Sequence, residues 1–167
     1  MKDAAEPTLS VRLGTPDEED KILELALQAW EENGIRSVNA EKMRAMIRPA
    51  LYLWEGLVGV IGDPGQRVEA AILLRVCSMW YSDDKILEEK AIFVHPDFRH
   101  GKIGRARMLT EFSKQIADGL KIPLLIGVLS SHRTEAKVKL YERQFGSPAG
   151  AFFLYNAKTG HESVTEH

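Results

Sequence analysis

The stretch from Ile92 to Met108 constrains the fold of this 167-residue chain more than any other part of its sequence. An apolar run of β type ends at Pro96, a basic turn with glycines follows, and a helical pattern starts near Ile103. The first turn of a helix presents unpaired N–H groups and the positive end of the helix dipole. Four cationic side chains lie in this stretch against one carboxylate. The pattern predicts an α/β protein with a phosphate site, although many α/β proteins carry such a turn without a ligand.

The segment from Val94 to Ala106 resembles the acyl-CoA-binding signature of the GNAT (Gcn5-related) N-acetyltransferases. In that signature, a strand that ends Val-x-Pro runs into Arg/Gln-x-x-Gly-x-Gly/Ala. Arg99 takes the Arg/Gln position and Gly104 takes the last position. Lys102 stands where the middle glycine is expected, and Gly101 lies one place earlier. The lysine restricts the backbone at this position, and its side chain would add positive charge beside a phosphate.

The resemblance implies a single-domain GNAT fold over residues 8–156, with flexible termini at 1–7 and 157–167, and acetyl-CoA as co-substrate. Backbone groups of Phe93 and Val94 would hold the pantetheine arm by strand-like pairing, and amides at the helix start would hold the pyrophosphate. The implied cofactor-binding residues are Phe93, Val94, Arg99, His100, Gly101, Lys102, Ile103, Gly104 and Arg105.

A second resemblance lies between Leu140 and Gly146, which is similar to the family's later Leu-Tyr-Glu-Lys-x-Gly-Phe segment with Phe and Gly transposed. The tyrosine of that segment commonly lies near the sulfur of CoA and gives a proton to the leaving thiolate. The resemblance therefore implies Tyr141 as a general acid. Tyr141 also shares a helix face with Val138 and Phe145, so a core aromatic residue with a partnered hydroxyl is the alternative.

Attack by an amine on a thioester requires a neutral amine, so a base must take its proton directly or through water. Glu88 and Glu89 lie on the strand that leads into the cofactor loop, where the family often has its base. Alternation places the two on opposite faces, and we favour Glu89. His132 is a further candidate because imidazole titrates near neutral pH. The alternatives are solvated carboxylates and an exposed loop histidine.

Composition narrows the class of protein. The net charge is −2 at pH 7, which argues against a nucleic-acid binder. All apolar runs are shorter than the roughly 20 residues of a membrane span, and the first residues are too polar and acidic for a signal peptide, so we expect a cytoplasmic protein. The single cysteine, Cys77, excludes an internal disulfide, and its spacing from the histidines matches no metal site.

Periodicity and turn residues predict a mixed α/β (α+β) chain, with a central sheet of about six to seven strands flanked by about four helices. The predicted strands span residues 9–13, 57–61, 68–76, 86–94, 123–129 and 151–155. The predicted helices span residues 15–33, 40–47, 103–119 and 134–145. Gly119 is expected to end the third helix, because glycine is the usual residue just past a helix end.

We therefore expect an enzyme that transfers an acetyl group from acetyl-CoA to a primary amine by direct attack. One alternative is a catalytically inactive GNAT-fold module that binds CoA or a partner protein, since Lys102 replaces a glycine. Another is a small α/β protein that uses the basic turn for nucleotide or RNA phosphates. The acceptor, a small-molecule or protein amine, stays open because residues 33–54 and 79–84 would form its wall. Trp80 and Tyr81 would line either the substrate cleft or a homodimer contact.

Overall fold

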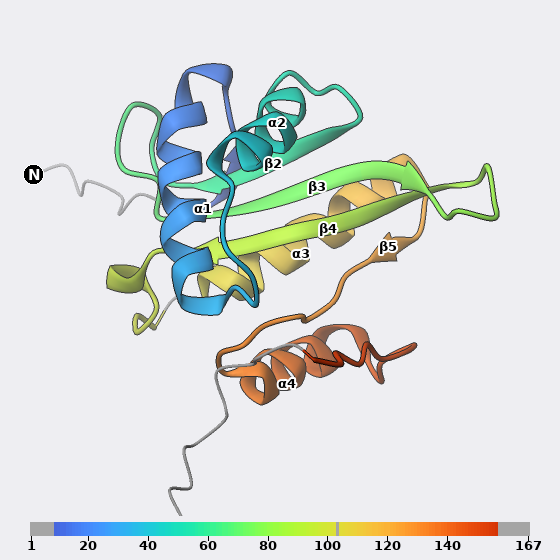
Figure 1. Cartoon of the computed structure of the whole chain (residues 1–167). Coiled ribbons are helices and arrows are strands. Elements are labelled where there is room, and N and C mark those ends of the chain that lie inside the picture. The colour runs from blue at the N-terminus through green and yellow to red at the C-terminus, as the bar shows by residue number, and fades with distance from the viewer. Residues whose placement is uncertain (1–8, 103, 157–167) are drawn as a thin grey trace, which may run out of the picture.

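A computed structural model describes residues 9–102 and 104–156 of the chain (Figure 1). The candidate residue Ile103 and the termini predicted to be flexible, 1–7 and 157–167, lie outside the described residues. The predicted mixed α/β class is confirmed, but the described sheet has five strands rather than six to seven. The sheet is antiparallel except that its last strand runs parallel to its neighbour. Its strands, in chain order and in spatial order, are β1 (Val11–Leu13), β2 (Gly56–Ile61), β3 (Ala70–Ser78), β4 (Lys85–Val94) and β5 (Leu124–Leu125).

Helices lie on both faces of the sheet, and α4 lies beside the sheet edge that β5 forms (Figure 1). α1 and α2 cover one face, and α3 covers the other. Alternation along β2 serves both layers: Val58 and Val60 join the apolar cluster under α1 and α2, whereas Leu57 and Ile61 join the cluster under α3. The helical elements are η1 (Pro16–Glu18), α1 (Glu19–Asn33), α2 (Ala40–Leu51), η2 (Pro96–Phe98), α3 (Arg105–Leu120) and α4 (Thr134–Phe145).

The packing of α3 onto the sheet depends on a glycine in β2. A Cβ atom at Gly59 would lie 2.6 Å from the ring of Phe112 and 2.9 Å from the Cγ2 atom of Ile72. The bare backbone therefore makes room for the Phe112 ring directly on the strands. This close approach fixes the height of α3 above the sheet and, with it, the position of the helix N-terminus.

The start of α1 is held by a buried carboxylate. Glu18 is 2% exposed, and its carboxylate accepts a hydrogen bond from the backbone N–H of Thr15 at 3.0 Å. The guanidinium of Arg12, on β1, lies 2.6 Å from the same carboxylate. Because this charge is both paired and hydrogen-bonded, it can be buried at the junction of the strand and the helix.

Several predicted boundaries differ from the structure by one to four residues; β3, for example, spans 70–78 instead of 68–76, and three of the differences have a clear physical reason. α2 continues through Pro49 to Leu51 instead of ending at residue 47, because its last residues are buried and extend the apolar face of the helix. α3 runs past Gly119, and Lys121 takes the left-handed conformation after the helix with φ of 56°. The strand predicted over 123–129 pairs only at β5, because the chain leaves β4 after Leu125.

The segment 151–155, predicted as a final strand, is not a strand in the structure. Its side chains point into solvent: Phe152, Phe153 and Tyr155 are 82%, 92% and 92% exposed. An apolar run fits the composition of a strand, but a strand forms only where a neighbouring edge is in reach. The sequence pattern carries no information on that neighbour.

Other features bear on the classes of function considered above. Of the helices within residues 9–102 and 104–156, none has the length and apolar character needed to cross a bilayer. The same residues contain no cluster of three or more side chains suited to holding a metal ion. Cys77 is half-buried, and burial together with the neighbouring Glu88 raises the pKa of its thiol. The thiol of Cys77 therefore stays protonated at neutral pH.

Candidate active site

β4 and β5 are paired at one end only. The register joins Leu87 to Leu124 and Glu88 to Leu125, and the described strands show no further pairing along that side of β4. The edge of β4 from Glu89 onward therefore leaves backbone groups available to an extended ligand. Phe93 lies on this stretch, with its side chain buried at 3% exposure.

A β-bulge at Lys90 changes which face each half of β4 presents. In the register with β3, Glu89 lies opposite Leu74 and Ala91 lies opposite Leu73, so Lys90 has no residue opposite to it. Leu74 belongs to the cluster under α3, whereas Ala91 belongs to the cluster under α1 and α2. Regular alternation would have put Glu89 and Ala91 on one face. The bulge instead leaves Glu89 on the α3 face while the rest of β4 keeps its place in the core.

The Glu89 carboxylate lies in an environment that favours its neutral form. Burial raises its pKa from the ordinary value of 4.5 to about 7, although a hydrogen bond from the backbone N–H of Gly127, at 3.5 Å, acts in the opposite direction. A carboxyl group with a pKa near neutrality is present in both forms at neutral pH. It can therefore take a proton from a substrate and release it again.

Glu88 has different partners and the opposite electrostatics. Its carboxylate lies 2.7 Å from the Lys90 ammonium and accepts a hydrogen bond from the Cys77 thiol at 3.3 Å. Partial burial favours the neutral acid, but the hydrogen bonds from Lys90 and Cys77 outweigh it, and the pKa of Glu88 is lowered. A carboxylate stabilised in this way is a weak base. The environments favour Glu89 over Glu88, and the catalytic role of either stays a prediction.

Tyr141 lies on α4, with its ring edge-to-face against Phe145 at a centroid distance of 5.9 Å. Burial first, and the negative charge of Glu89 second, raise the pKa of the phenol, so it keeps its proton at neutral pH. No residue of α4 is fully buried, which sets Tyr141 apart from an ordinary core aromatic residue. A phenol that is protonated and close to a carboxylate of raised pKa can serve as a proton donor.

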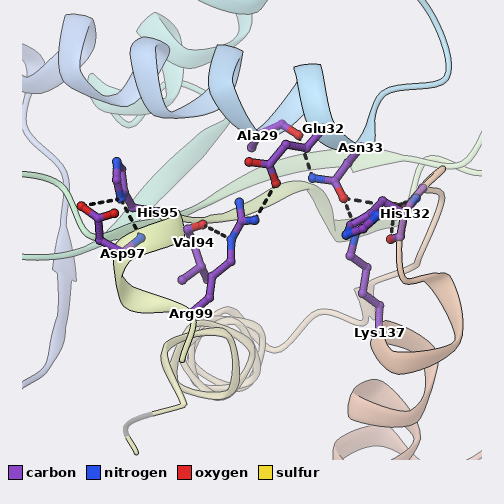
Figure 2. Close-up of polar contacts among 10 residues, drawn as sticks. Ala29, Glu32, Asn33, Val94, His95, Asp97, Arg99, His132 and Lys137 are labelled. Atoms are coloured by element: carbon purple, nitrogen blue, oxygen red, sulfur yellow. Dashed lines mark hydrogen bonds and ion pairs between the residues drawn. The ribbon is translucent and has the colours of Figure 1, made fainter. Parts of the chain in front are cut away.

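The signature arginine, Arg99, is bound within the protein. Its Nη1 atom lies 2.5 Å from the Glu32 carboxylate at the end of α1, and its Nε–H donates to the carbonyl of Val94 at 2.9 Å (Figure 2). The carbonyl of Val94, one of the predicted pantetheine contacts, is therefore already occupied by Arg99. The Arg99 side chain thus links the end of α1 to the end of β4. The main chain of Arg99 continues into the predicted cofactor loop.

The side chain of Arg105 also has a structural role. Arg105 is 9% exposed, and its Nη2 atom lies 2.7 Å from the carboxylate of Glu69. Its guanidinium also lies over the ring of Phe98, 4.6 Å from the centroid. The side chain of this implied cofactor-binding residue thus anchors the first turn of α3 to Glu69 and Phe98.

The remaining loop residues, His100, Gly101 and Lys102, are exposed beside the start of α3. Gly104 is the N-cap of the helix, and no side chain accepts a hydrogen bond from the first turn at this position. Among the described residues that are not its chain neighbours, a Cβ atom at Gly104 would meet only the Cβ atom of Arg107, at 3.5 Å. The helix N-terminus is therefore open to an anion, with the Lys102 ammonium as a nearby cation.

A polar cluster that the sequence did not indicate joins the end of α1 to the first turn of α4 (Figure 2). The Lys137 ammonium donates to Oδ1 of Asn33 at 2.6 Å and to Oγ of Ser130 at 2.7 Å. Burial, followed by the charge of Arg99, lowers the pKa of Lys137. His132 lies in the same loop with an exposed side chain. Lys137 and Asn33 are 104 positions apart, so no local pattern in the sequence connects them.

Comparison with known proteins gives matches at the level of structure. No protein-family model and no curated protein sequence matches the chain. A possible acetyltransferase from Clostridium difficile 630 is 15% identical, with 88% of this chain and 96% of that chain covered and a TM-score of 0.67. Aminoglycoside N-acetyltransferase AAC(6')-Iy in complex with CoA is 13% identical, with coverages of 92% and 97% and a TM-score of 0.69.

A third similar structure is the ribosomal-protein-alanine N-acetyltransferase from Brucella melitensis biovar Abortus 2308. It is 13% identical, with 89% of this chain and 98% of that chain covered and a TM-score of 0.63. At such identities the likeness concerns the fold, and it extends over nearly the full length of each similar structure. The sheet order, the parting of β4 from β5 and these likenesses lead to one conclusion: the chain has the GNAT acetyltransferase fold.

Proposed function

We propose that the protein transfers an acetyl group from acetyl-CoA to a primary amine by direct attack. The observation that carries the proposal is the combination of Glu89, with its pKa near 7, and the protonated Tyr141 beside the unpaired edge of β4. Glu89 is in an environment suited to taking a proton, and Tyr141 is protonated at neutral pH and so has a proton to give, which together suit a reaction that moves two protons. The acetyltransferases of similar fold support the same class of chemistry.

The proposed donor, acetyl-CoA, would lie along β4 and against the start of α3. The unpaired edge of β4 would receive the pantetheine arm, and the open amides of the first α3 turn would receive the pyrophosphate. Lys102, exposed beside that turn, would add a positive charge. Arg99 and Arg105 would keep the turn in position through their contacts with Glu32 and Glu69. The CoA complex of a protein with the same fold supports this choice of donor.

The reaction then follows from the two groups. The neutral amine nitrogen attacks the carbonyl carbon of the thioester, and the Glu89 carboxylate takes a proton from that nitrogen. The carbon–sulfur bond breaks as the tetrahedral intermediate collapses, and the hydroxyl of Tyr141 gives its proton to the leaving sulfur. The proton on Glu89 returns to the tyrosinate through solvent, so both groups regain their starting states.

The proposed acceptor is a small-molecule amine. One protein of similar fold is an aminoglycoside N-acetyltransferase, which supports an acceptor of this kind. Another is a ribosomal-protein-alanine N-acetyltransferase, so a protein amine is the second candidate. A screen against both classes, with release of free CoA as the signal, would separate them.

The first test is acetyl-CoA binding, measured by calorimetry on the wild type and on Gly104→Trp. The indole would fill the approach to the helix start, where Arg107 is the neighbour that a Cβ would meet among residues 9–102 and 104–156, chain neighbours aside. Gly119→Trp is the matched control, because a Cβ there meets nothing within 4 Å and lies at the other end of α3. We expect binding by the wild type and the control and none by Gly104→Trp. No binding by the wild type would rule out the proposal.

The second test separates an enzyme from an inactive CoA-binding module. Tyr141→Phe removes the proton donor and leaves the ring, so kcat should fall by roughly a hundredfold while acetyl-CoA affinity stays within about twofold. Tyr155→Phe, an exposed tyrosine after α4 and outside the predicted acceptor wall, is the control and should keep the wild-type kcat. An unchanged kcat in Tyr141→Phe would exclude Tyr141 as the acid.

A further inference from the structure

The polar cluster between the end of α1 and the first turn of α4 contains a lysine that the reaction above does not use. The Lys137 side chain points from α4 towards Asn33, the last residue of α1 (Figure 2). Asn33 is also the first residue of the segment 33–54, which is predicted to form the acceptor wall. The Lys137 ammonium therefore lies where the predicted acceptor wall begins.

Two neutral oxygens hold the ammonium in place. Lys137 donates to Oδ1 of Asn33 at 2.6 Å and to Oγ of Ser130 at 2.7 Å. The Asn33 amide is itself fixed, because its Nδ2 group donates to the carbonyl of Ala29 at 2.7 Å. The backbone N–H of Ser131 donates to the Asn33 carbonyl at 3.1 Å, which ties the loop before α4 to α1. An ammonium has three N–H donors, so these two bonds to described residues leave a third for a ligand.

The charges around Lys137 favour an anion. The side chain is half-buried, and both of these hydrogen-bond partners are uncharged. Burial, and then the charges of Arg99 and Arg133, lower the pKa of the lysine. The Glu32 carboxylate acts in the opposite direction, but it lies 2.5 Å from Arg99 and pairs with it. A carboxylate from a ligand would add negative charge here and accept a charge-assisted hydrogen bond from the ammonium.

The lysine also lies close to the groups proposed to move protons. Lys137 and Tyr141 are four residues apart on α4, so they share a helix face and are separated by about one turn, roughly 5.4 Å. The charge of Glu89 acts in turn on the Tyr141 phenol. A ligand group bound at Lys137 would therefore lie only a short way from the reacting amine, as the carboxylate of an amino acid does.

We propose that Lys137 binds a carboxylate of the acceptor, so that the acetyl group goes to the amine of an amino acid. This inference rests on the proposed acetyl transfer and narrows its acceptor from small-molecule amines in general to those that carry a carboxylate. The ammonium would keep its bonds to Asn33 and Ser130 and use its third N–H on the carboxylate. An acceptor with several positive charges would be repelled by Lys137 and Arg133.

The experiment compares free amino acids with their carboxamides as acceptors, with release of free CoA as the signal. The panel consists of the α-amino acids, β-alanine and 4-aminobutyrate, each beside its own carboxamide. Loss of the carboxylate lowers the pKa of the amine and supplies more of the reactive neutral form, so the chemistry alone favours the carboxamide. We expect the wild type to use at least one free amino acid with kcat/KM at least about tenfold above that of its carboxamide.

Three variants test whether this preference comes from the lysine. Lys137→Met should reduce it to less than about threefold by raising KM for the free acid, with the carboxamide little changed. Lys137→Arg keeps the charge and should keep most of the preference. Lys139→Met, which removes an exposed lysine from the same helix, is the matched control and should keep all of it. Acetyl-CoA affinity, measured by calorimetry, should equal that of the wild type in every variant, which also shows that each one is folded.

Equal use of acids and carboxamides by the wild type, no use of any amino acid, or a preference that survives in Lys137→Met would overturn the proposal. Turnover of spermidine without turnover of amino acids would refute this inference alone, whereas no acetyl-CoA binding by the wild type would refute the acetyl transfer as well. Succinyl-CoA tests whether the carboxylate belongs to the donor instead. A preference for succinyl-CoA over acetyl-CoA that is lost in Lys137→Met would place the carboxylate on the acyl group and refute its assignment to the acceptor.

Discussion

Replacing Glu89 by glutamine should remove most of the pH dependence of stability between about pH 5 and about pH 8. The carboxyl has a pKa near 7 in the folded protein, because burial disfavours its charge, and near 4.5 in the unfolded chain. A raised carboxyl pKa means that the folded state binds the proton more tightly. Its stabilising effect is therefore greatest at low pH and is lost as the pH rises from 4.5 through about 7.

The size of the effect follows from the two pKa values. One pKa unit corresponds to about 1.4 kcal/mol, so ionising this half-buried carboxyl costs up to about 3.5 kcal/mol above pH 7. Part of that cost is already present at the lower pH, because the unfolded chain has begun to ionise there. The wild type should therefore lose about 2.5 kcal/mol of unfolding free energy across the interval through this group alone.

Urea unfolding at the two pH values, on the wild type and Glu89→Gln, measures the difference. Glu88→Gln is the matched control, since the pKa of Glu88 is lowered and the group stays ionised throughout the interval. We expect the control to lose nearly as much stability as the wild type, since the Glu88 charge raises the Glu89 pKa less than burial does, and Glu89→Gln to lose about 2.5 kcal/mol less. The reasoning is refuted if all three proteins lose the same amount, because the Glu89 carboxyl would then titrate normally.

Two further substitutions test the contacts that hold the site. Arg105→Met leaves the Glu69 carboxylate without its partner and should lower the unfolding free energy by about 2 to 3 kcal/mol in urea, whereas Arg107→Met on the exposed side should change it by less than about 0.5; equal effects would contradict the structural role of Arg105. The hydrogen bond from Arg12 lowers the pKa of Glu18, so this carboxylate stabilises the fold above pH 4.5 and the contribution is lost as the pH falls further. Glu18→Gln should therefore flatten the acid limb of the melting temperature, as followed by circular dichroism, and an unchanged limb would speak against this assignment.

The sequence predicts elements well where its pattern and their packing agree. The helix predicted over 15–33 forms as the short turn η1 followed by α1 and ends at Asn33, because the apolar stripe that predicts the helix is the surface buried in the core. The start of α4 at Thr134 and its end at Phe145 also match the prediction. The sheet edge is different. The apolar segment 151–155 has the composition of a strand, yet its pairing depends on where a distant edge lies, which no local pattern specifies.

In the candidate site, too, local features could be predicted from the sequence, and contacts between distant segments could not. The residue spacing correctly places Glu88 and Glu89 on a strand that leads to the α3 start. It cannot show that Lys90 forms a bulge, because a bulge is a property of the pairing between two strands. It also suggests that Arg99 and Arg105 meet a phosphate, whereas their partners, Glu32 and Glu69, lie far away in the chain. A count of charges along the sequence cannot show that carboxylates distant in the chain neutralise these two arginines.

The polar attachment of α4 has a consequence for the order of events at the site. No residue of α4 is fully buried, and its ends are held by hydrogen bonds from Lys137 to Asn33 and between Gln144 and Thr110. A segment with little buried apolar surface opens locally, ahead of global unfolding, so α4 should exchange its amide hydrogens faster than the sheet. A pantetheine arm between β4 and α4 would supply the missing contacts. The helix that carries Tyr141 would then become fully ordered only when the donor is bound. Binding of the donor would in the same step place the tyrosine for proton transfer.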